Sequence, residues 1–218
     1  MKMFERSSRT SSRYRCRRML NSGWTPDLSN SSAGSPAYAA ALEVQEFLSR
    51  ARAKFCFIGG VALQRWGQPR LTQDVDVTLL CGLGEESVAI DWLLAKFPAR
   101  LPDARDFALR NRVLLLRAGS RVPIDVSLGA IPFEHRCVAR ASEFDFGAGF
   151  RLLTCSAEDL IVLKAFASRP QDWIDIEAVV LRQHRTLNWK LVFEELEPLV
   201  TLRETPEVLD RLRKLRQG

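Results

Sequence analysis

The chain has 218 residues, 46% of them hydrophobic and 27% charged, a composition typical of a globular protein with a sizeable core. No apolar stretch approaches the ~18–20 residues that span a bilayer, and the N-terminus lacks the apolar segment of a secretory signal, so we expect a cytoplasmic protein without a membrane anchor. The five cysteines are scattered with no CxxC pair, which argues against a disulfide framework or a zinc site and favours reduced thiols.

The net charge of +6 is concentrated at the N-terminus. Residues 1–36 carry seven basic and two acidic side chains, whereas the rest of the chain has a net charge of only +1. This Ser- and Arg-rich segment cannot bury enough apolar surface to offset its chain entropy, so we predict a disordered basic tail. It is either a misassigned start, a tether for RNA or another polyanion, or an organelle transit peptide, and the lack of an amphipathic pattern favours the first two.

After Pro36 the apolar pattern predicts alternating helices and strands. In chain order we expect a helix over 37–52, a buried strand over 55–58 closed by a glycine pair, a short helix over 61–66, a strand over 74–80, an amphipathic helix over 85–97, a hairpin of strands 113–117 and 122–128, and loop with edge strand over 133–150. From Ser156 the pattern is helical, with helices over 156–168, 170–183, 189–203 and 206–216. The fold class is therefore α+β: a mixed sheet flanked by helices over 37–155, followed by a helical C-terminal region over 156–218.

Two carboxylates stand out in the predicted strand 74–80. Asp74 and Asp76 lie two residues apart, so the period of a strand directs both to one face, while Val75 and Val77 face a core. Neighbouring carboxylates repel each other unless a cation lies between them, and Mg²⁺ prefers such oxygen ligands. An exposed edge strand with solvated charges is the alternative, which the flanking apolar residues disfavour.

A third carboxylate and a glycine pair complete the predicted site. Asp125 lies in an equally apolar strand, and if that strand is adjacent, three carboxylates converge in a way that suits chemistry with two Mg²⁺ ions. The alternative for Asp125 is a turn cap or a partner for Arg121. Gly59 and Gly60 lie where a strand gives way to a helix, so their backbone N–H groups can approach the phosphates of a nucleoside triphosphate (NTP).

These motifs resemble the signature of the polymerase-beta-like nucleotidyltransferase superfamily, in which a glycine pair is followed by Asp-x-Asp in a strand. The chain is most similar to the AbiEii-type branch, the abortive-infection toxins, because Arg70 and Thr72 precede Asp74 as in its Arg-x-Thr-x-Asp-x-Asp run. Residues 157–177 look like its second signature, a helical Lys164 followed by the Asp172/Asp175 pair. The resemblance covers roughly residues 40–185.

The resemblance implies transfer of a nucleoside monophosphate from an NTP to an acceptor hydroxyl, in some relatives the 3′ end of tRNA, as the toxin of a toxin–antitoxin pair. It implies a nucleotidyltransferase-type core whose site the C-terminal helices complete. By position it makes Asp74 and Asp76 metal ligands and Lys164 a phosphate-binding cation, and the strand pattern adds Asp125 as an assisting metal ligand. Asp172 or Asp175 belongs to the catalytic set, and Gly59, Gly60, Arg70 and Thr72 to the nucleotide-binding set.

Other interpretations of the second signature remain open. Lys164 could lie along the helix surface, Asp172 could be an acid in the first helical turn, and Asp175 could pair with Arg169 or Arg182. The acceptor could instead be an aminoglycoside-like small molecule or a protein side chain. Because Gly60 stands where many superfamily members have Ser, a relative that binds nucleotides without catalysis is a further alternative.

Overall fold

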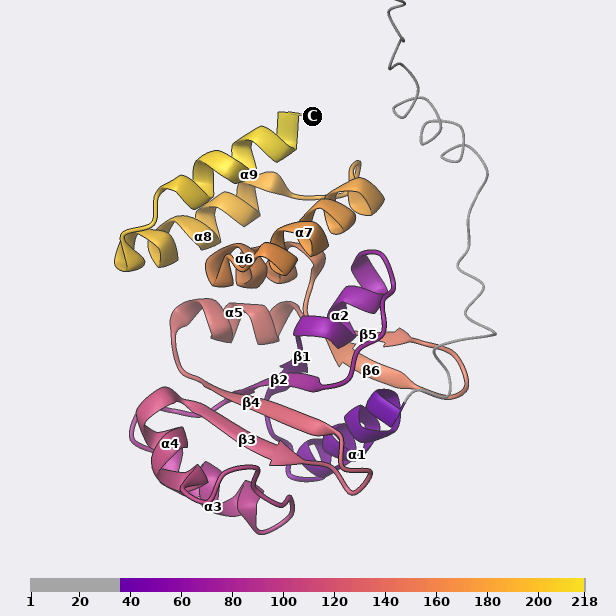
Figure 1. Ribbon diagram of the computed structural model, residues 1–218, viewed down its shortest axis with the longest axis vertical. Helices are drawn as coiled ribbons and strands as arrows, with labels where there is room; N and C mark the ends of the chain where they lie inside the picture. The colour runs from indigo at the N-terminus through magenta and orange to yellow at the C-terminus, as the bar shows by residue number, and fades with distance from the viewer. Residues whose placement is uncertain (1–35, 218) are drawn as a thin grey trace, which may run out of the picture.

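The computed structural model describes residues 36–217, which fold into a mixed sheet with helices on both faces (Figure 1). The predicted α+β class is thereby confirmed. The strands lie in the order β3-β4-β2-β1-β6-β5. Their bounds are β1 Phe55–Phe57, β2 Val75–Leu80, β3 Val113–Arg117, β4 Pro123–Gly129, β5 Ser142–Asp145 and β6 Arg151–Thr154.

The helices fall into two groups by position in the chain. The first group is α1 Pro36–Arg50, α2 Gly59–Trp66, α3 Glu86–Leu94, α4 Ala104–Asn111 and α5 Pro132–Arg140. The second is the C-terminal group, α6 Ala157–Ala167, α7 Pro170–Gln183, α8 Trp189–Arg203 and α9 Glu207–Gln217. None of the helices in this part of the chain combines the length and the apolar character needed to cross a membrane.

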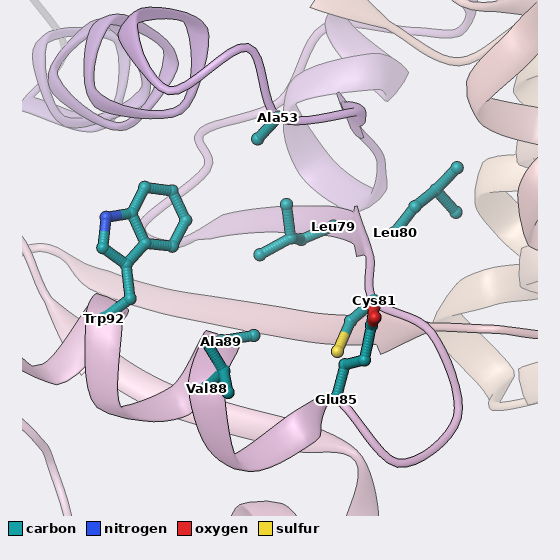
Figure 2. Close-up of a pocket in the computed structure, with 8 residues that line it drawn as sticks. All are labelled: Ala53, Leu79, Leu80, Cys81, Glu85, Val88, Ala89 and Trp92. Carbon is teal, nitrogen blue, oxygen red and sulfur yellow. The ribbon is translucent and has the colours of Figure 1, made fainter.

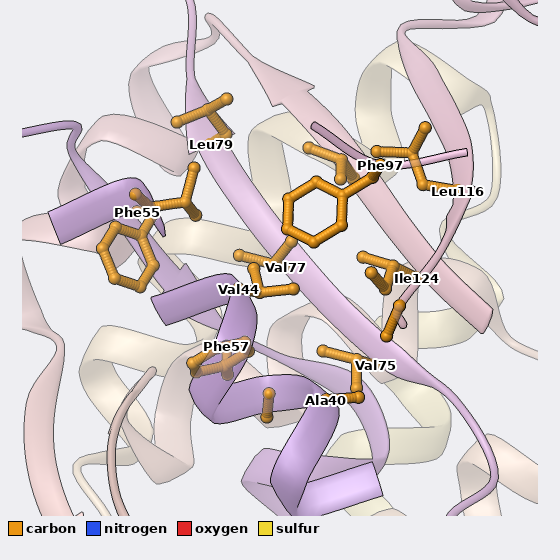
Figure 3. Packing of buried hydrophobic residues seen from close by; sticks show 14 of the residues in the cluster. Ala40, Val44, Phe55, Phe57, Val75, Val77, Leu79, Phe97, Leu116 and Ile124 are labelled. Atoms are coloured by element: carbon orange, nitrogen blue, oxygen red, sulfur yellow. The ribbon is translucent and has the colours of Figure 1, made fainter. Parts of the chain in front are cut away.

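Strand β2 is central to the sheet and separates two apolar clusters. Val75, Val77 and Leu79 face one side, where they pack with β1, β4 and α1 (Figure 3). The opposite face is covered by α2, α5 and the C-terminal helices, with Trp173 among the largest buried side chains there. Because side chains alternate along a strand, burial of the three apolar residues directs Asp76 to the face that carries α2 and α6.

The pairing of β2 decides which residues are its neighbours. β1 runs antiparallel to β2, with Phe57 opposite Val77, and β4 runs parallel to it. The predicted hairpin is confirmed, since β3 and β4 pair antiparallel around the turn at residues 118–122. The parallel register brings the start of β4, and therefore this turn, to the same edge of the sheet as the start of β2.

The prediction of loop and edge strand over 133–150 is wrong for its first half. Helix α5 occupies Pro132–Arg140, with Pro at its first position, and the Glu134 carboxylate accepts hydrogen bonds from the N–H groups of Ala130 (2.7 Å) and Ile131 (3.0 Å). Phe133 and Cys137, four residues apart, are its buried face. Helix α4 and strand β6 were also not predicted.

The C-terminal helices begin where the sequence indicates. Ser156 caps α6 by accepting a hydrogen bond from the Asp159 N–H at 3.1 Å. The bounds of α7 and α8 match the predicted helices over 170–183 and 189–203. The predicted disordered tail over 1–36 lies, apart from Pro36 in α1, outside the described residues, and the division at residue 155 stays a prediction.

Candidate active site

Two of the predicted acids lie side by side in the sheet. Asp76 of β2 is directly opposite Asp125 of β4 in the parallel register, so their side chains leave the same face. Asp74 lies just before β2 and is exposed. The condition set for Asp125, that its strand lies beside β2, is thus met, and the convergence of all three carboxylates stays a prediction.

The glycine pair contacts this carboxylate edge. The backbone of Gly59 has φ +54°, and a Cβ there would lie 1.9 Å from Asp76 Oδ2. Only glycine can therefore adopt this conformation against the carboxylate. The Ile58 N–H donates to the Asp76 carbonyl at 3.0 Å, and the backbone N–H of Gly60 acts to lower the pKa of the Asp76 carboxylate. The N-terminus of helix α2 thus lies against Asp76.

Thr72 joins the loop before β2 to the same turn. A Cβ on Gly60 would lie 2.2 Å from Thr72 Oγ1, so the two residues pack without space for a side chain at position 60. The Thr72 hydroxyl donates to the Asp74 carboxylate and to its carbonyl, each at 3.3 Å. The absence of Ser at position 60 therefore has a steric reason, because the Thr72 hydroxyl occupies that space.

Burial and neighbouring carboxylates raise the pKa of Asp76 and of Asp125. Burial, followed by the charges of Asp74 and Asp125, raises the pKa of Asp76 to about 6, against the opposing influence of the Gly60 N–H and Lys164. Burial also raises the pKa of Asp125, where the neighbouring Arg100 opposes the shift and Asp74 adds to it. This edge of the sheet therefore carries more negative charge than its neighbours compensate, which is the property of a cation-binding site.

Asp125 has a cation partner that the sequence did not reveal. The guanidinium of Arg100 forms an ion pair with the Asp125 carboxylate, and the alternative pairing with Arg121 is not what the structure shows. Within residues 36–217, no three His, Cys, Asp or Glu side chains are grouped so that they could hold a metal ion. Asp74 and Asp76 are the carboxylates of this edge without an ion pair among the described residues, and they remain suitable oxygen ligands.

The second signature forms a buried ion network. Lys164 Nζ lies 2.7 Å from Asp175 Oδ2 and 3.3 Å from Asp172 Oδ1, and only 7% of its side chain is exposed. The alternative of a lysine along the helix surface is therefore wrong. Because two carboxylates already surround the ammonium group, its role as a phosphate-binding cation stays a prediction.

Two arginines complete this network. Arg70 donates to both carboxylate oxygens of Asp175 at 3.2–3.3 Å, and Arg169 donates to Asp172 at 2.7 Å. Burial pushes the pKa of each aspartate up, but hydrogen bonds from Arg169 to Asp172 and from Lys164 to Asp175 hold both pKa values below the usual range. Arg70, rather than Arg169 or Arg182, is thus the arginine that pairs with Asp175.

A cavity of about 370 Å³ lies away from these acids. Figure 2 shows its lining between the end of β2 and α3, including Leu79, Cys81, Val88 and Trp92. These residues lie at or after the C-terminal end of β2, whereas Asp76 lies near its start. The lining is mainly apolar. It lacks the paired carboxylates and the glycine turn that lie at the Asp76 edge.

A protein-family model matches residues 44–197 and carries the description "Nucleotidyl transferase AbiEii toxin, Type IV TA system". The chain belongs to this AbiEii family. It is therefore a nucleotidyltransferase, and the resemblance drawn from the two signatures is confirmed. No protein among those with curated descriptions matches the chain.

Several solved structures are similar to this AbiEii-family protein. The antibiotic-resistance factor ANT(2'')-Ia is 18% identical, over 81% of this chain and 96% of that one, with a TM-score of 0.47. An antigenic nucleotidyltransferase-like protein from Paracoccidioides brasiliensis is 15% identical, over 78% and 88%, with a TM-score of 0.46. The lincosamide antibiotic adenylyltransferase LnuA, bound to lincomycin, is 11% identical, over 65% and 94%, with a TM-score of 0.44.

Proposed function

We propose that this AbiEii-family protein transfers a nucleoside monophosphate from an NTP to a hydroxyl at the 3′ end of an RNA, with Asp74 and Asp76 holding Mg²⁺. The observation that carries the proposal is the position of Asp76 against the glycine turn together with its raised pKa. Its carboxylate touches the glycine turn, and its pKa is raised by burial and by two further carboxylates. A bound cation would relieve this repulsion, and the phosphates of an NTP bring such a cation with them.

The donor set fits a hard divalent cation. Asp74 and Asp76 would hold Mg²⁺, with the carboxylate of Asp125 beside them. When bound, Mg²⁺ would neutralise triphosphate charge and favour attack at the α-phosphorus with pyrophosphate as the leaving group.

The chain's own groups would bind and orient the reactants. The N-terminus of α2, which starts at Gly59, offers backbone N–H groups and a positive dipole end to the phosphates. Arg70 links the loop that carries Thr72 and Asp74 to Asp175 of α7, so the C-terminal helices would hold that loop in position. Positioning and electrostatic stabilisation would then account for most of the rate acceleration.

Exposed arginines support an anionic acceptor. Arg70 and Arg169 border the site on one side, and Arg117 and Arg121 lie in or beside the β3–β4 turn at the same edge of the sheet. Such a border attracts a phosphate backbone and repels a polycationic aminoglycoside. The basic segment 1–36, with its net charge of +5, would add to the attraction for RNA.

The acceptor can be identified by following the transfer of an α-phosphate label from the NTP. The full chain is incubated with each α-labelled NTP and Mg²⁺, with total RNA, total protein or an aminoglycoside mixture as acceptor. We expect label in RNA, loss of that label with Asp76→Ala, and no loss with Asp106→Ala on the exposed face of α4. A chain starting at Pro36 is expected to label RNA less well and with a weaker dependence on salt. Label only in protein or small molecules would contradict the RNA acceptor, and label unaffected by Asp76→Ala would contradict the site.

We also propose that this activity is the toxic half of a toxin–antitoxin pair and acts in the cytoplasm. The family description supports this context. Induced expression is expected to arrest growth with the natural sequence and not with Asp76→Ala, and co-expression of a neighbouring gene's product is expected to relieve the arrest. Equal growth of the two strains at equal protein level would contradict the proposal.

A further inference from the structure

Arg100 is placed beside the acids by the sheet itself. Ala99 forms an isolated antiparallel bridge with Leu116 of β3, and the Arg100 N–H donates to the Leu115 carbonyl at 2.9 Å. The segment before α4 is thus attached to the free edge of β3. Leu115 is opposite Asp125, and Asp125 is opposite Asp76, so these three residues form a row across the neighbouring strands. Arg100 lies beside Leu115 and extends this row by one residue.

This row explains how Arg100, which lies 25 positions before Asp125 in the chain, comes close to the Asp125 side chain. Residues opposite one another in neighbouring strands have side chains on the same face, so the Arg100 side chain leaves on the face that carries the acids. It extends past Leu115, and its guanidinium meets the Asp125 carboxylate. Both side chains are partly buried, with 23% and 35% exposed, so water screens this pair less than a surface pair.

The guanidinium depends on Asp125 for its hydrogen bonding. Arg100 Nε is the one buried side-chain nitrogen or oxygen in residues 36–217 without a hydrogen-bond partner. If Asp125 turned away to bind a metal ion, the partly buried guanidinium would lose its carboxylate as well. The structure therefore favours Asp125 bound to Arg100 over Asp125 bound to metal.

We infer that Arg100 takes the place of a second metal ion, so that the site binds one divalent cation through Asp74 and Asp76. This inference rests on the proposed function. The charges agree with it: three carboxylates and one guanidinium carry a net charge of −2, which one divalent ion neutralises. Lys164 is near enough to oppose the charge of Asp76, but its own charge is matched by Asp172 and Asp175, which pair with it. The sequence-based expectation of two Mg²⁺ ions is replaced by one ion and one arginine.

The stoichiometry of Mn²⁺ binding tests the inference without measuring activity. Free Mn²⁺ is followed by electron paramagnetic resonance in titrations of the full chain saturated with an α,β-methylene NTP analogue. The natural sequence is expected to bind one ion per chain, and Arg100→Gln two. Arg110→Gln is the matched control, because its side chain is 65% exposed on α4 and has no place in the proposed site, and it is expected to bind one.

Two further variants keep the test decisive if Arg100→Gln unfolds. Arg100→Lys retains the charge and is expected to bind one ion. Asp125→Asn is expected to bind one ion with affinity within about threefold of the natural sequence, since Asp125 is held by Arg100. Two ions on the natural sequence, one ion on a folded Arg100→Gln chain, or loss of the ion from Asp125→Asn would overturn the inference alone. Failure of the natural sequence to bind any Mn²⁺ would overturn the proposed function as well.

Discussion

Two groups of acids on the same side of the sheet are in opposite electrostatic states. At the start of β2 and β4, Asp76 and Asp125 have pKa values raised by burial and by neighbouring acids. In α7, Asp172 and Asp175 are buried, yet lysine and arginine partners hold their pKa values down. In the first group Arg100 is the one ion-pair partner and Asp76 has none among the described residues, whereas both acids of the second group are paired with lysine and arginine.

The difference indicates separate roles for the two sequence signatures. Under the proposed function the acids that repel each other bind a ligand, so their removal should affect ligand binding more than folding. Acids with buried cation partners hold elements together, and here they connect α6, α7 and the loop that carries Arg70. Their removal should affect folding first and activity as a consequence.

The largest expected effect is on folding, from Lys164→Met. The change leaves Asp172 and Asp175 buried without their shared ammonium group, and removal of one partner from a buried ion network costs about 3–5 kcal/mol. Urea unfolding at neutral pH measures it. Lys190→Met, which removes an exposed i,i+4 pair with Glu194, is the control and should change stability by less than about 0.5 kcal/mol. Equal effects of the two substitutions would remove the contrast between the two groups.

The second effect is the pH dependence of folding that Asp76 causes in metal-free protein. Its pKa is about 6 in the native state and 3.8 when unperturbed, so the native state binds the proton more tightly between these values. The free energy of unfolding is therefore higher at low pH, and it falls by about 2–3 kcal/mol as the pH rises from about 4 to 6. Asp76→Asn should remove this loss. The check is urea unfolding at pH 4–7 in a metal chelator, and parallel pH profiles for the two proteins would contradict the assignment.

A smaller effect, about 1–3 kcal/mol, is expected from Gly60→Ala. The new Cβ would lie 2.2 Å from Thr72 Oγ1, so Thr72 must shift. Thr72→Ala removes that oxygen, and the double variant should recover part of the stability, giving a measurable coupling in a double-mutant cycle. Gly119→Ala is the matched control, because its Cβ would meet Glu43 at an ordinary 3.6 Å. Additive effects of the two substitutions would show that the glycine turn and Thr72 do not pack as described.

The smallest effect on folding is expected from Arg70→Gln. Its side chain is 43% exposed, and Asp175 keeps Lys164 and Gln171 as partners, so the loss should be at most about 1 kcal/mol. The loop with Thr72 and Asp74 loses its link to α7, however, and we expect a rise in the KM for the NTP. Thermal unfolding and steady-state kinetics measure the two effects. A loss of stability as large as that of Lys164→Met would place Arg70 among the folding residues.

The sequence was sufficient for those parts of the site that depend on local pattern. The alternation in β2 directs Asp76 away from the apolar core, and a glycine pair between strand and helix indicates the close approach found at Gly59. The helices from Ser156 onward follow from capping and period. In α5, the Pro132 and Glu134 pair was a local signal that the prediction overlooked.

Contacts between distant segments could not be read in this way. Arg100 reaches Asp125 only because a single bridge attaches its segment to β3, and no sequence spacing encodes that register. Asp175 likewise pairs with Arg70, 105 residues away, rather than with the nearby arginines. In both cases tertiary packing selects one arginine among many, so the sequence could supply the acids but not their partners.

The most direct test of the central claim is the shift in melting temperature that Mg²⁺ causes in the natural sequence and in Asp76→Asn. In a chelator the variant should melt at a higher temperature, because it lacks the repelled carboxylate. Millimolar Mg²⁺ with an α,β-methylene NTP analogue should raise the melting temperature of the natural sequence by several degrees and leave that of the variant nearly unchanged. An equal rise in both proteins would show that the metal and the nucleotide bind elsewhere.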